Sequence, residues 1–207
     1  EYCFSIVYKE TAGFRNCGNI AIDDVTITGY APGEGGEVTP PAGGEPVEFE
    51  IFENFDDETH FSDGGSVPNG WLSNGTYDYA RPYRCYSWDA GVMPHSGDYI
   101  LFSQDQIGSD RDEVVFTPMM KLAGGKEATI SFFIQAPGGT PVATFYSTVE
   151  VKAGTAQTLE AQTVALGATT GAVADWTEVK YTFTPEADGE YCFSIVYKET
   201  AGFRNCG

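Results

Sequence analysis

The stretch EYCFSIVYKETAGFRNCG decides the fold of this chain, because it fills residues 1–18 and occurs again, letter for letter, at residues 190–207. An identity of this length is far beyond chance, and self-similarity at a fixed offset is the mark of a repeated architecture. The offset is 190 − 1 = 189 residues, which is about the size of one domain. The sequence therefore predicts a segment of a tandem array.

Three regions follow from this duplication. Residues 1–30 are predicted to be the terminal strands of the preceding repeat, since NIAIDDVTITGY at 19–30 has the alternation of a strand. Residues 31–46 are rich in Gly, Pro and Glu with hardly any apolar bulk, which is typical of a linker. Residues 47–207 are predicted to form a domain that lacks its own last strand.

The composition favours an all-β fold. Hydrophobic residues make up 42% of the chain, which is enough for a sizeable core, and 25 Gly and 11 Pro indicate many turns. Strand candidates lie at residues 98–103, 112–118, 128–136, 142–153, 157–166, 175–185 and 190–199. With the strand that begins at Val47 and a final strand from 19–30, about nine or ten strands predict a jelly-roll β-sandwich.

The missing last strand needs a donor, because an open sandwich exposes unpaired N–H and C=O groups and a strip of core. We expect residues 19–30 of a neighbouring repeat or subunit to close it, in a head-to-tail arrangement of identical units. Folding back from the chain's own N-terminus and a circular permutation are the other interpretations. Residues 1–18 and 190–207 compete for one place in a single sandwich, which favours the tandem interpretation.

The net charge of −19 excludes several functions. No basic surface exists to bind nucleic acid phosphates, and no apolar run is long enough to span a bilayer. An acidic surface suits a soluble extracellular protein and hard cations such as calcium. The two histidines, His60 and His95, lie in no recognisable catalytic setting, and GxSxG, HExxH and phosphate-loop motifs are absent, so we expect no enzyme activity.

The cysteines reduce to three per repeat, because Cys17 is the copy of Cys206 and Cys3 is the copy of Cys192. Cys206 lies in a polar loop and Cys85 in the aromatic stretch YRCYSW. A disulfide between them would close a loop of roughly 120 residues and stabilise the domain by about 4–5 kcal/mol. The alternative is that no bridge forms; Cys192, in the middle of a strand, is expected to be a buried thiol.

Several motifs resemble one family in their order. They are ENFDD followed by Pro68-Asn-Gly-Trp71, then SGDYILFS, DEVVFTPMMKL, ATISFFIQA, WTEVKYTF and a closing NIAIDDVTIT. In this order the chain resembles the MAM-like jelly-roll modules of bacterial surface proteins, which are called cleaved-adhesin or choice-of-anchor domains. The resemblance implies a secreted, non-catalytic module that holds calcium where the first strand meets the last.

Carboxylates gather at the positions where calcium is expected. The candidate ligands are Glu53, Asp56, Asp57, Asp98, Asp23 and Asp24. A calcium ion takes six to eight oxygen ligands, and an Asp pair inside an apolar strand needs a cation or backbone donors. The resemblance favours Glu53, Asp56 and Asp24 first. The alternative is that these groups cap turns and face water.

The aromatic stretch between Trp71 and Trp88, which includes Tyr77, can stack sugars or pack over one end of the sandwich. Asn74 opens a glycosylation sequon. Together the features predict a structural subunit of an extracellular filament or stalk. The alternative is an adhesive or carbohydrate-binding module that binds a glycan or a surface protein, with repetition supplying avidity.

Overall fold

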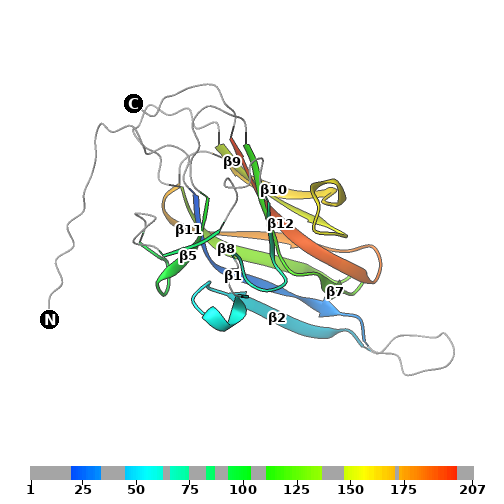
Figure 1. Cartoon of the computed structure of the whole chain (residues 1–207). Coiled ribbons are helices and arrows are strands. Elements are labelled where there is room, and N and C mark those ends of the chain that lie inside the picture. Colours follow the sequence, from blue (N-terminus) through cyan, green and yellow to red (C-terminus); the bar gives the residue numbers. More distant parts are fainter. Residues whose placement is uncertain are drawn as a thin grey trace, which may run out of the picture.

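The structure is a computed structural model, and it is all-β (Figure 1). It describes residues 20–33, 45–62, 66–74, 83–86, 93–103, 111–136, 147–170 and 173–199. These residues form two antiparallel sheets of six strands each, joined by loops and two short 3-10 helices, η1 (Glu58–His60) and η2 (Leu159–Ala161). The predicted β-sandwich is therefore confirmed. Within the described ranges no helix is long and apolar enough to cross a membrane.

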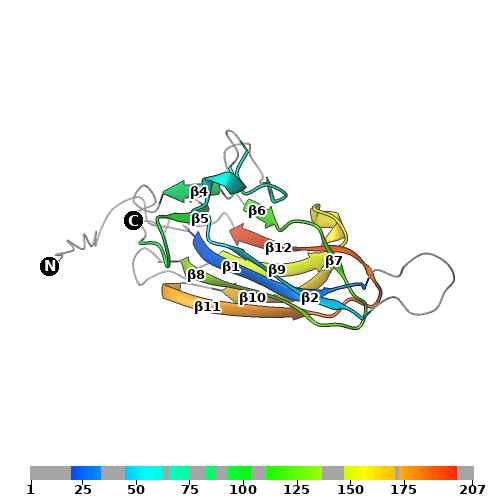
Figure 2. The same ribbon diagram turned by 90° about the horizontal axis from the view of Figure 1, so that it is seen from below.

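The first sheet, sheet A, has the strand order β11-β8-β1-β5-β4, and β2 pairs with the second half of β1. Its strands are β1 (Ile20–Ala31), β2 (Val47–Glu53), β4 (Tyr83–Tyr86), β5 (Tyr99–Ser103), β8 (Ala128–Ala136) and β11 (Val173–Phe183). Figure 2 shows β2 running beside β1. One edge of β1 is thus covered by β8, and the other is shared between β5 and β2.

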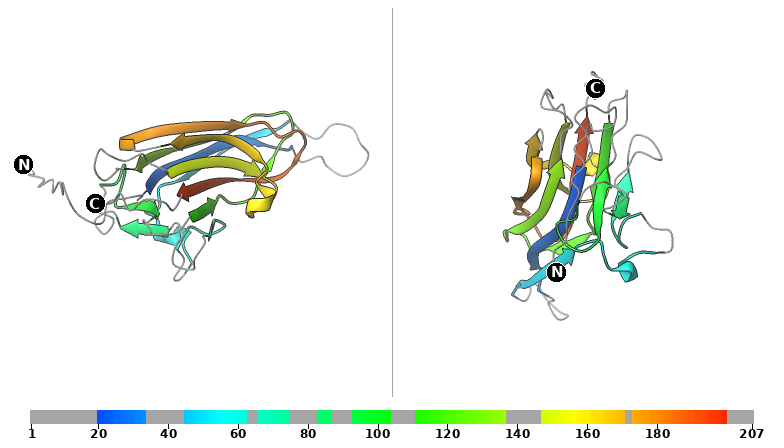
Figure 3. Two further views of the ribbon diagram at one scale, coloured as in Figure 1. Left: turned by 90° about the horizontal axis from the view of Figure 1, so that it is seen from above. Right: turned by 90° about the vertical axis from the view of Figure 1, so that its left-hand side faces the viewer.

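The second sheet, sheet B, has the order β10-β9-β12-β6-β3, and β7 pairs with the start of β12. Its strands are β3 (Leu72–Asn74), β6 (Arg111–Phe116), β7 (Met120–Leu122), β9 (Ser147–Gly154), β10 (Val164–Thr170) and β12 (Gly189–Glu199). The chain passes repeatedly from one sheet to the other, at β2–β3, β3–β4, β5–β6, β7–β8, β8–β9, β10–β11 and β11–β12. Figure 3 shows that the strands of both layers run in roughly the same direction, as in aligned sandwiches.

The core lies between the two sheets. Alternating residues of each strand point inward, and the two inner faces meet in one cluster of buried side chains. Ile27 and Ile130 of sheet A are 0% exposed, and Val151, Phe193 and Ile195 of sheet B are at most 3% exposed. Both β1 and β12, which carry the end of one repeat and the duplicated stretch, are therefore central to the fold.

The strand that closes the sandwich is β1, at the position expected for residues 19–30. In this structure the same chain supplies it, whereas the sequence predicts a neighbouring repeat or subunit as the donor. The physical reason is the antiparallel pairing of β1 with β2, which puts Ala31 opposite Val47, so that residues 32–46 need only bridge two adjacent strand ends. The division of the chain into 1–30, 31–46 and 47–207 stays a prediction.

One strand candidate is wrong. Residues 157–166 form η2 and only the first residues of β10, because the chain folds back after β9. A Cβ at Gly154 would overlap the carbonyl group of Ala161, so this close return requires glycine. Gln162, which is 4% exposed, fixes the return by donating to the Ala156 carbonyl at 2.8 Å.

Candidate functional site

Two aspartates of β1 hold the segment that precedes β5. Asp23 is 0% exposed, and its Oδ2 accepts hydrogen bonds from the backbone N–H groups of His95 and Ser96, both at 3.0 Å. Its Oδ1 accepts from the Asp24 N–H at 2.8 Å. The register of β1 against β8 shifts between Asp23 and Thr26, and Asp24 has a positive φ of 48°. This bulge turns both carboxylates toward the same segment.

Asp24 completes the contact from β1. Its Oδ2 lies 2.6 Å from His95 Nδ1, and its Oδ1 accepts from the Ser96 hydroxyl at 2.5 Å. The His95 ring stacks on Phe133 with a centroid distance of 3.5 Å and an interplanar angle of 14°. The indole of Trp176 meets the same ring edge to face at 6.0 Å. His95 is thereby fixed between carboxylate and aromatic groups on the outer side of sheet A.

A third aspartate, from the loop after β2, holds the other half of the same segment. Asp56 Oδ1 accepts from the N–H groups of Asp98 at 2.9 Å and Tyr99 at 3.1 Å. Gly97 lies between the two pairs of donors with φ of 56°, and a Cβ at this position would overlap Asp56 Oδ2. We call Asp23, Asp24, Asp56 and residues 95–99 the aspartate clasp. It joins β1, the β2 loop and β5.

Burial affects the protonation of one member of the clasp, Asp23. Removal from water raises the pKa of Asp23 from 3.8 to about 6, although the amide hydrogen bonds from Ser96 and Asp24 act in the opposite direction. The charged carboxylate is therefore held mainly by backbone dipoles. The Asp23 carboxylate is therefore expected to take up a proton at mildly acidic pH.

The remaining acidic residues of the β2 loop have partners of their own. Glu53 is 4% exposed; its Oε1 accepts from the Phe55 N–H at 2.6 Å, and its Oε2 lies 2.9 Å from His60 Nδ1. Asp57 caps η1 by accepting from the Thr59 N–H at 2.9 Å and hydroxyl at 2.7 Å. The Thr59 hydroxyl and amide lower the pKa of Asp57. Both carboxylates thus fix the local backbone.

Arg84 of β4 secures this loop from the other side, and the sequence reasoning did not single it out. Its Nε donates to the Phe55 carbonyl at 2.6 Å and its Nη2 to the Asp56 carbonyl at 3.2 Å. The guanidinium lies 3.4 Å from the ring centroid of Tyr99 and 4.7 Å from that of Phe61. The available signal was a lone basic residue in the aromatic stretch YRCYSW of an acidic chain.

The six candidate calcium ligands are not gathered around one point. Asp23 and Asp24 meet His95 and Ser96, Asp56 meets the Asp98 and Tyr99 amides, Asp57 caps η1, and Asp98 is exposed. In the part of the chain that the structure describes, no group of three or more His, Cys, Asp or Glu side chains could hold a metal ion. Several of the oxygens that a cation would need already contact amide, hydroxyl or imidazole groups. Calcium binding therefore stays a prediction.

The other predicted site residues are scattered. Trp71 is 8% exposed and packs edge to face on Phe55 at 6.0 Å, so no face of its ring is open to a sugar. Asn74 is exposed at the end of β3. Tyr77 and Trp88 lie outside the described residues.

The described residues include only some of the cysteines for which predictions were made. Cys85 is 7% exposed on β4, but Cys206 and Cys17 lie outside the described ranges, so the disulfide stays a prediction. Cys192 is 0% exposed and accepts from Gln162 Nε2 at 3.2 Å. Burial raises the pKa of its thiol, as is usual for the buried thiol that the sequence predicted.

The outer surface of sheet A carries a row of small hydroxyl side chains that the sequence reasoning did not single out. Thr26 and Thr28 of β1 lie opposite Ser131 and Thr129 of β8, and all four are half-buried. Phe52 of β2 is the partner of Thr26 and is 52% exposed. We call these five residues the hydroxyl face. The alternation of the strands could have predicted it once the strand order was known.

The fold and these surfaces define an all-β sandwich module. No family model matches the chain, and no curated protein matches it. Among solved structures it is similar to the K1 cleaved adhesin domain of Lys-gingipain from Porphyromonas gingivalis W83, with a TM-score of 0.44 and 14% identity, over 66% of this chain and 94% of that domain. A likeness of this size supports no conclusion about the function of the chain.

Proposed function

We propose that the chain is a binding module of an extracellular surface protein, displayed in tandem copies so that many weak contacts act together. The observation that carries this proposal is where the chain enters and leaves the sandwich. If β1 belongs to the preceding unit, as the duplication predicts, the unit begins at Val47 and ends at a copy of Ala31. These two residues are direct partners in the β1–β2 ladder.

The same conclusion follows from the other division. If the unit runs from β1 to β12, it begins near Ile20 and ends near Glu199. Ile20 lies opposite Ser103, the last residue of β5, and Glu199 lies opposite Arg111 and Ser147, the first residues of β6 and β9. Their near neighbours Ile22, Val149 and Tyr197 line one small cavity with Ser103, so these strand ends lie at one end of the sandwich.

In either division of the chain, the polypeptide enters and leaves the sandwich at the same end. A sandwich held in this way adds little to the length of an array and projects from it sideways. Its outer faces stay accessible, whereas a rod-like spacer would use the long axis of each unit. This geometry favours display of a binding surface, and multivalent display raises apparent affinity by 10²–10⁴-fold without new contacts.

The hydroxyl face is the surface that we propose for binding. Its four hydroxyl groups can donate and accept hydrogen bonds, and Phe52 supplies a flat apolar ring at the edge. This combination suits a glycan, which presents hydroxyl groups along its rim and C–H groups on its faces. A glycan or a glycosylated surface protein is therefore the proposed partner.

Glycan-array binding of the whole chain, followed by calorimetry on the hits, tests the proposal. We expect Phe52→Ala to weaken binding by about tenfold, since truncating an aromatic anchor costs more than about 1 kcal/mol. Leu159→Ala is the matched control, because Leu159 is 40% exposed on η2, away from sheet A. Equal affinities of the two variants, or no glycan bound, would contradict the proposal.

A filament or stalk is the second candidate, and the duplicated 18 residues support it. Identical units joined head to tail through residues 32–46 would make long, uniform chains. Electron microscopy of the native material distinguishes the two candidates. Regular filaments that bind no glycan would favour the filament subunit, whereas flexible strings of projecting beads would favour display.

A further inference from the structure

The place of β12 in sheet B is defined by contacts on both edges. Residues 194–199 pair with β6, residues 192–199 pair with β9, and residues 189–191 pair with β7. Phe193 is 1% exposed, and its ring meets Phe183 edge to face at 6.3 Å. Without β12, sheet B would lose its central strand and a large part of the core.

Every residue of β12 except its first, Gly189, occurs a second time in the chain. Residues 1–10 have the same ten letters as residues 190–199. Hence Phe4 corresponds to Phe193, and each pairing and core contact of one segment is chemically available to the other. The place between β6 and β9 cannot discriminate between the two copies by sequence.

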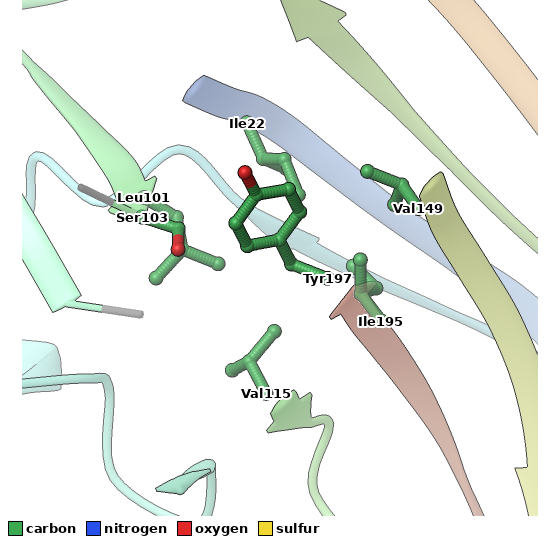
Figure 4. A pocket seen from close by; sticks show the side chains of 7 residues that line it. All are labelled: Ile22, Leu101, Ser103, Val115, Val149, Ile195 and Tyr197. Carbon is green, nitrogen blue, oxygen red and sulfur yellow. The ribbon is translucent and has the colours of Figure 1, made fainter. Parts of the chain in front are cut away.

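Either copy can also be connected to the rest of the sandwich by the available length of chain. Tyr197 of β12 and Ile22 of β1 line the same small cavity, with a volume of about 10 Å³, at one end of the sandwich (Figure 4). If residues 1–10 took the place of β12, the nine residues 11–19 would have to join the end of that strand to Ile20. Nine residues reach about 30 Å, whereas packed sheets are about 10 Å apart.

We propose that the place between β6 and β9 binds either of the two identical segments, so that one chain folds in two alternative frames. In one frame the sandwich uses residues 190–199 and leaves 1–18 outside; in the other it uses residues 1–10 and leaves 190–207 outside. The proposal concerns a single chain and does not depend on the proposed binding function.

The two frames differ chiefly in one connection. The first keeps the five residues 184–188 between β11 and β12, and the second keeps the nine residues 11–19 between the replacement strand and β1. Loop closure scales with the 3/2 power of length, which favours the shorter connection by about twofold. The frame with residues 190–199 in place is then the major one, and the other is substantially populated.

Alanine substitutions in one copy at a time test the exchange in the whole chain. Phe193→Ala damages only the first frame and Phe4→Ala only the second. We expect each single variant to melt within about 2 °C of the parent. The variant with both substitutions has no intact copy and should melt about 10 °C lower, since truncating a buried Phe is among the most costly core changes.

Limited trypsin digestion with mass spectrometry identifies which copy lies outside the sandwich, and a change in stability alone would not change that result. The parent should be cut first at Lys9 and Arg15, and Phe193→Ala should move the first cuts to Lys198 and Arg204. A Phe193→Ala variant that melts as low as the double variant, or that is still cut first at Lys9, overturns the proposal. A rescue that appears only at high protein concentration, together with dimers, also overturns it, because the exchange would then be between chains.

Discussion

Replacing Gly97 with alanine tests whether the aspartate clasp fixes the chain between β1, the β2 loop and β5. Gly97 has a φ of 56°, and an added Cβ would overlap the Asp56 carboxylate. That carboxylate is not free to move, because its Oδ1 accepts from the Asp98 and Tyr99 amides at 2.9 and 3.1 Å. The methyl group therefore forces the carboxylate away from both donors.

The expected loss has two parts. A positive φ costs a non-glycine residue about 1 kcal/mol. Two hydrogen bonds to a charged group contribute about 1.5–3 kcal/mol each when buried, and this pair is partly exposed, so about 2 kcal/mol in total is a reasonable figure. We expect Gly97→Ala to lower the free energy of unfolding by about 3 kcal/mol and the melting temperature by about 6–12 °C. Urea titration and thermal melts followed by circular dichroism measure both.

Gly125 provides the matched control, because it has a similar φ of 72° and no atom within 4 Å of an added Cβ. Gly125→Ala should cost only the backbone part, about 1 kcal/mol. Asp56→Ala combined with Gly97→Ala should cost less than the sum of the single changes, since the overlap is then removed. If Gly97→Ala is no more destabilising than Gly125→Ala, the clasp does not hold this segment and the reasoning fails.

Three further predictions concern the same region. The pKa of Asp23 is raised from 3.8 to about 6, so between these values the folded state binds more protons than the unfolded state, and this group lowers the stability of the protein by about 2 kcal/mol as the pH rises. The urea midpoints at pH 4 and pH 7 should therefore differ more for the parent than for Asp23→Asn. Equal differences for the two proteins would contradict this prediction. Calcium at about 1 mM (in the extracellular range) should leave the melting temperature unchanged relative to EDTA, because the described carboxylates are not gathered around one point and several of their oxygens already have hydrogen-bond partners. A rise of several degrees would support the sequence-based calcium prediction instead. Arg84→Lys should cost about 2 kcal/mol in urea titrations, since lysine cannot reproduce the paired carbonyl contacts and the stacking on Tyr99, whereas Lys126→Arg should change nothing measurable and serves as its control.

The strands with strict alternation could be predicted from the sequence, and so could their assembly into a sandwich. NIAIDDVTITGY and EYCFSIVYKE both read as strands, and both lie at the centre of a sheet. Alternation reports which side of a strand is buried, but it does not report the partner. For this reason the sequence left open whether a neighbour or the same chain supplies β1.

Less of the candidate site could be predicted from the sequence. The clustering of carboxylates around Asp23 and Asp56 was visible, but their partners are backbone amides of residues 95–99, which carry no sequence signal. Gly97 is the exception in principle, because a glycine between polar residues indicates an unusual φ. For Trp71 the sequence left both sugar stacking and packing open, and the ring is buried; a turn-rich stretch does not show which of its aromatic residues pack inward.

The pairing of Ala31 with Val47 also sets how the module would respond to force. If the units divide as the sequence predicts, these two residues are the ends of one unit, and a pull on them loads the β1–β2 ladder one hydrogen-bonded pair after another instead of shearing all pairs at once. Antiparallel strands opened in this direction resist weakly. If the proposed display function holds, arrays of such modules would lengthen under load and refold when the load is released.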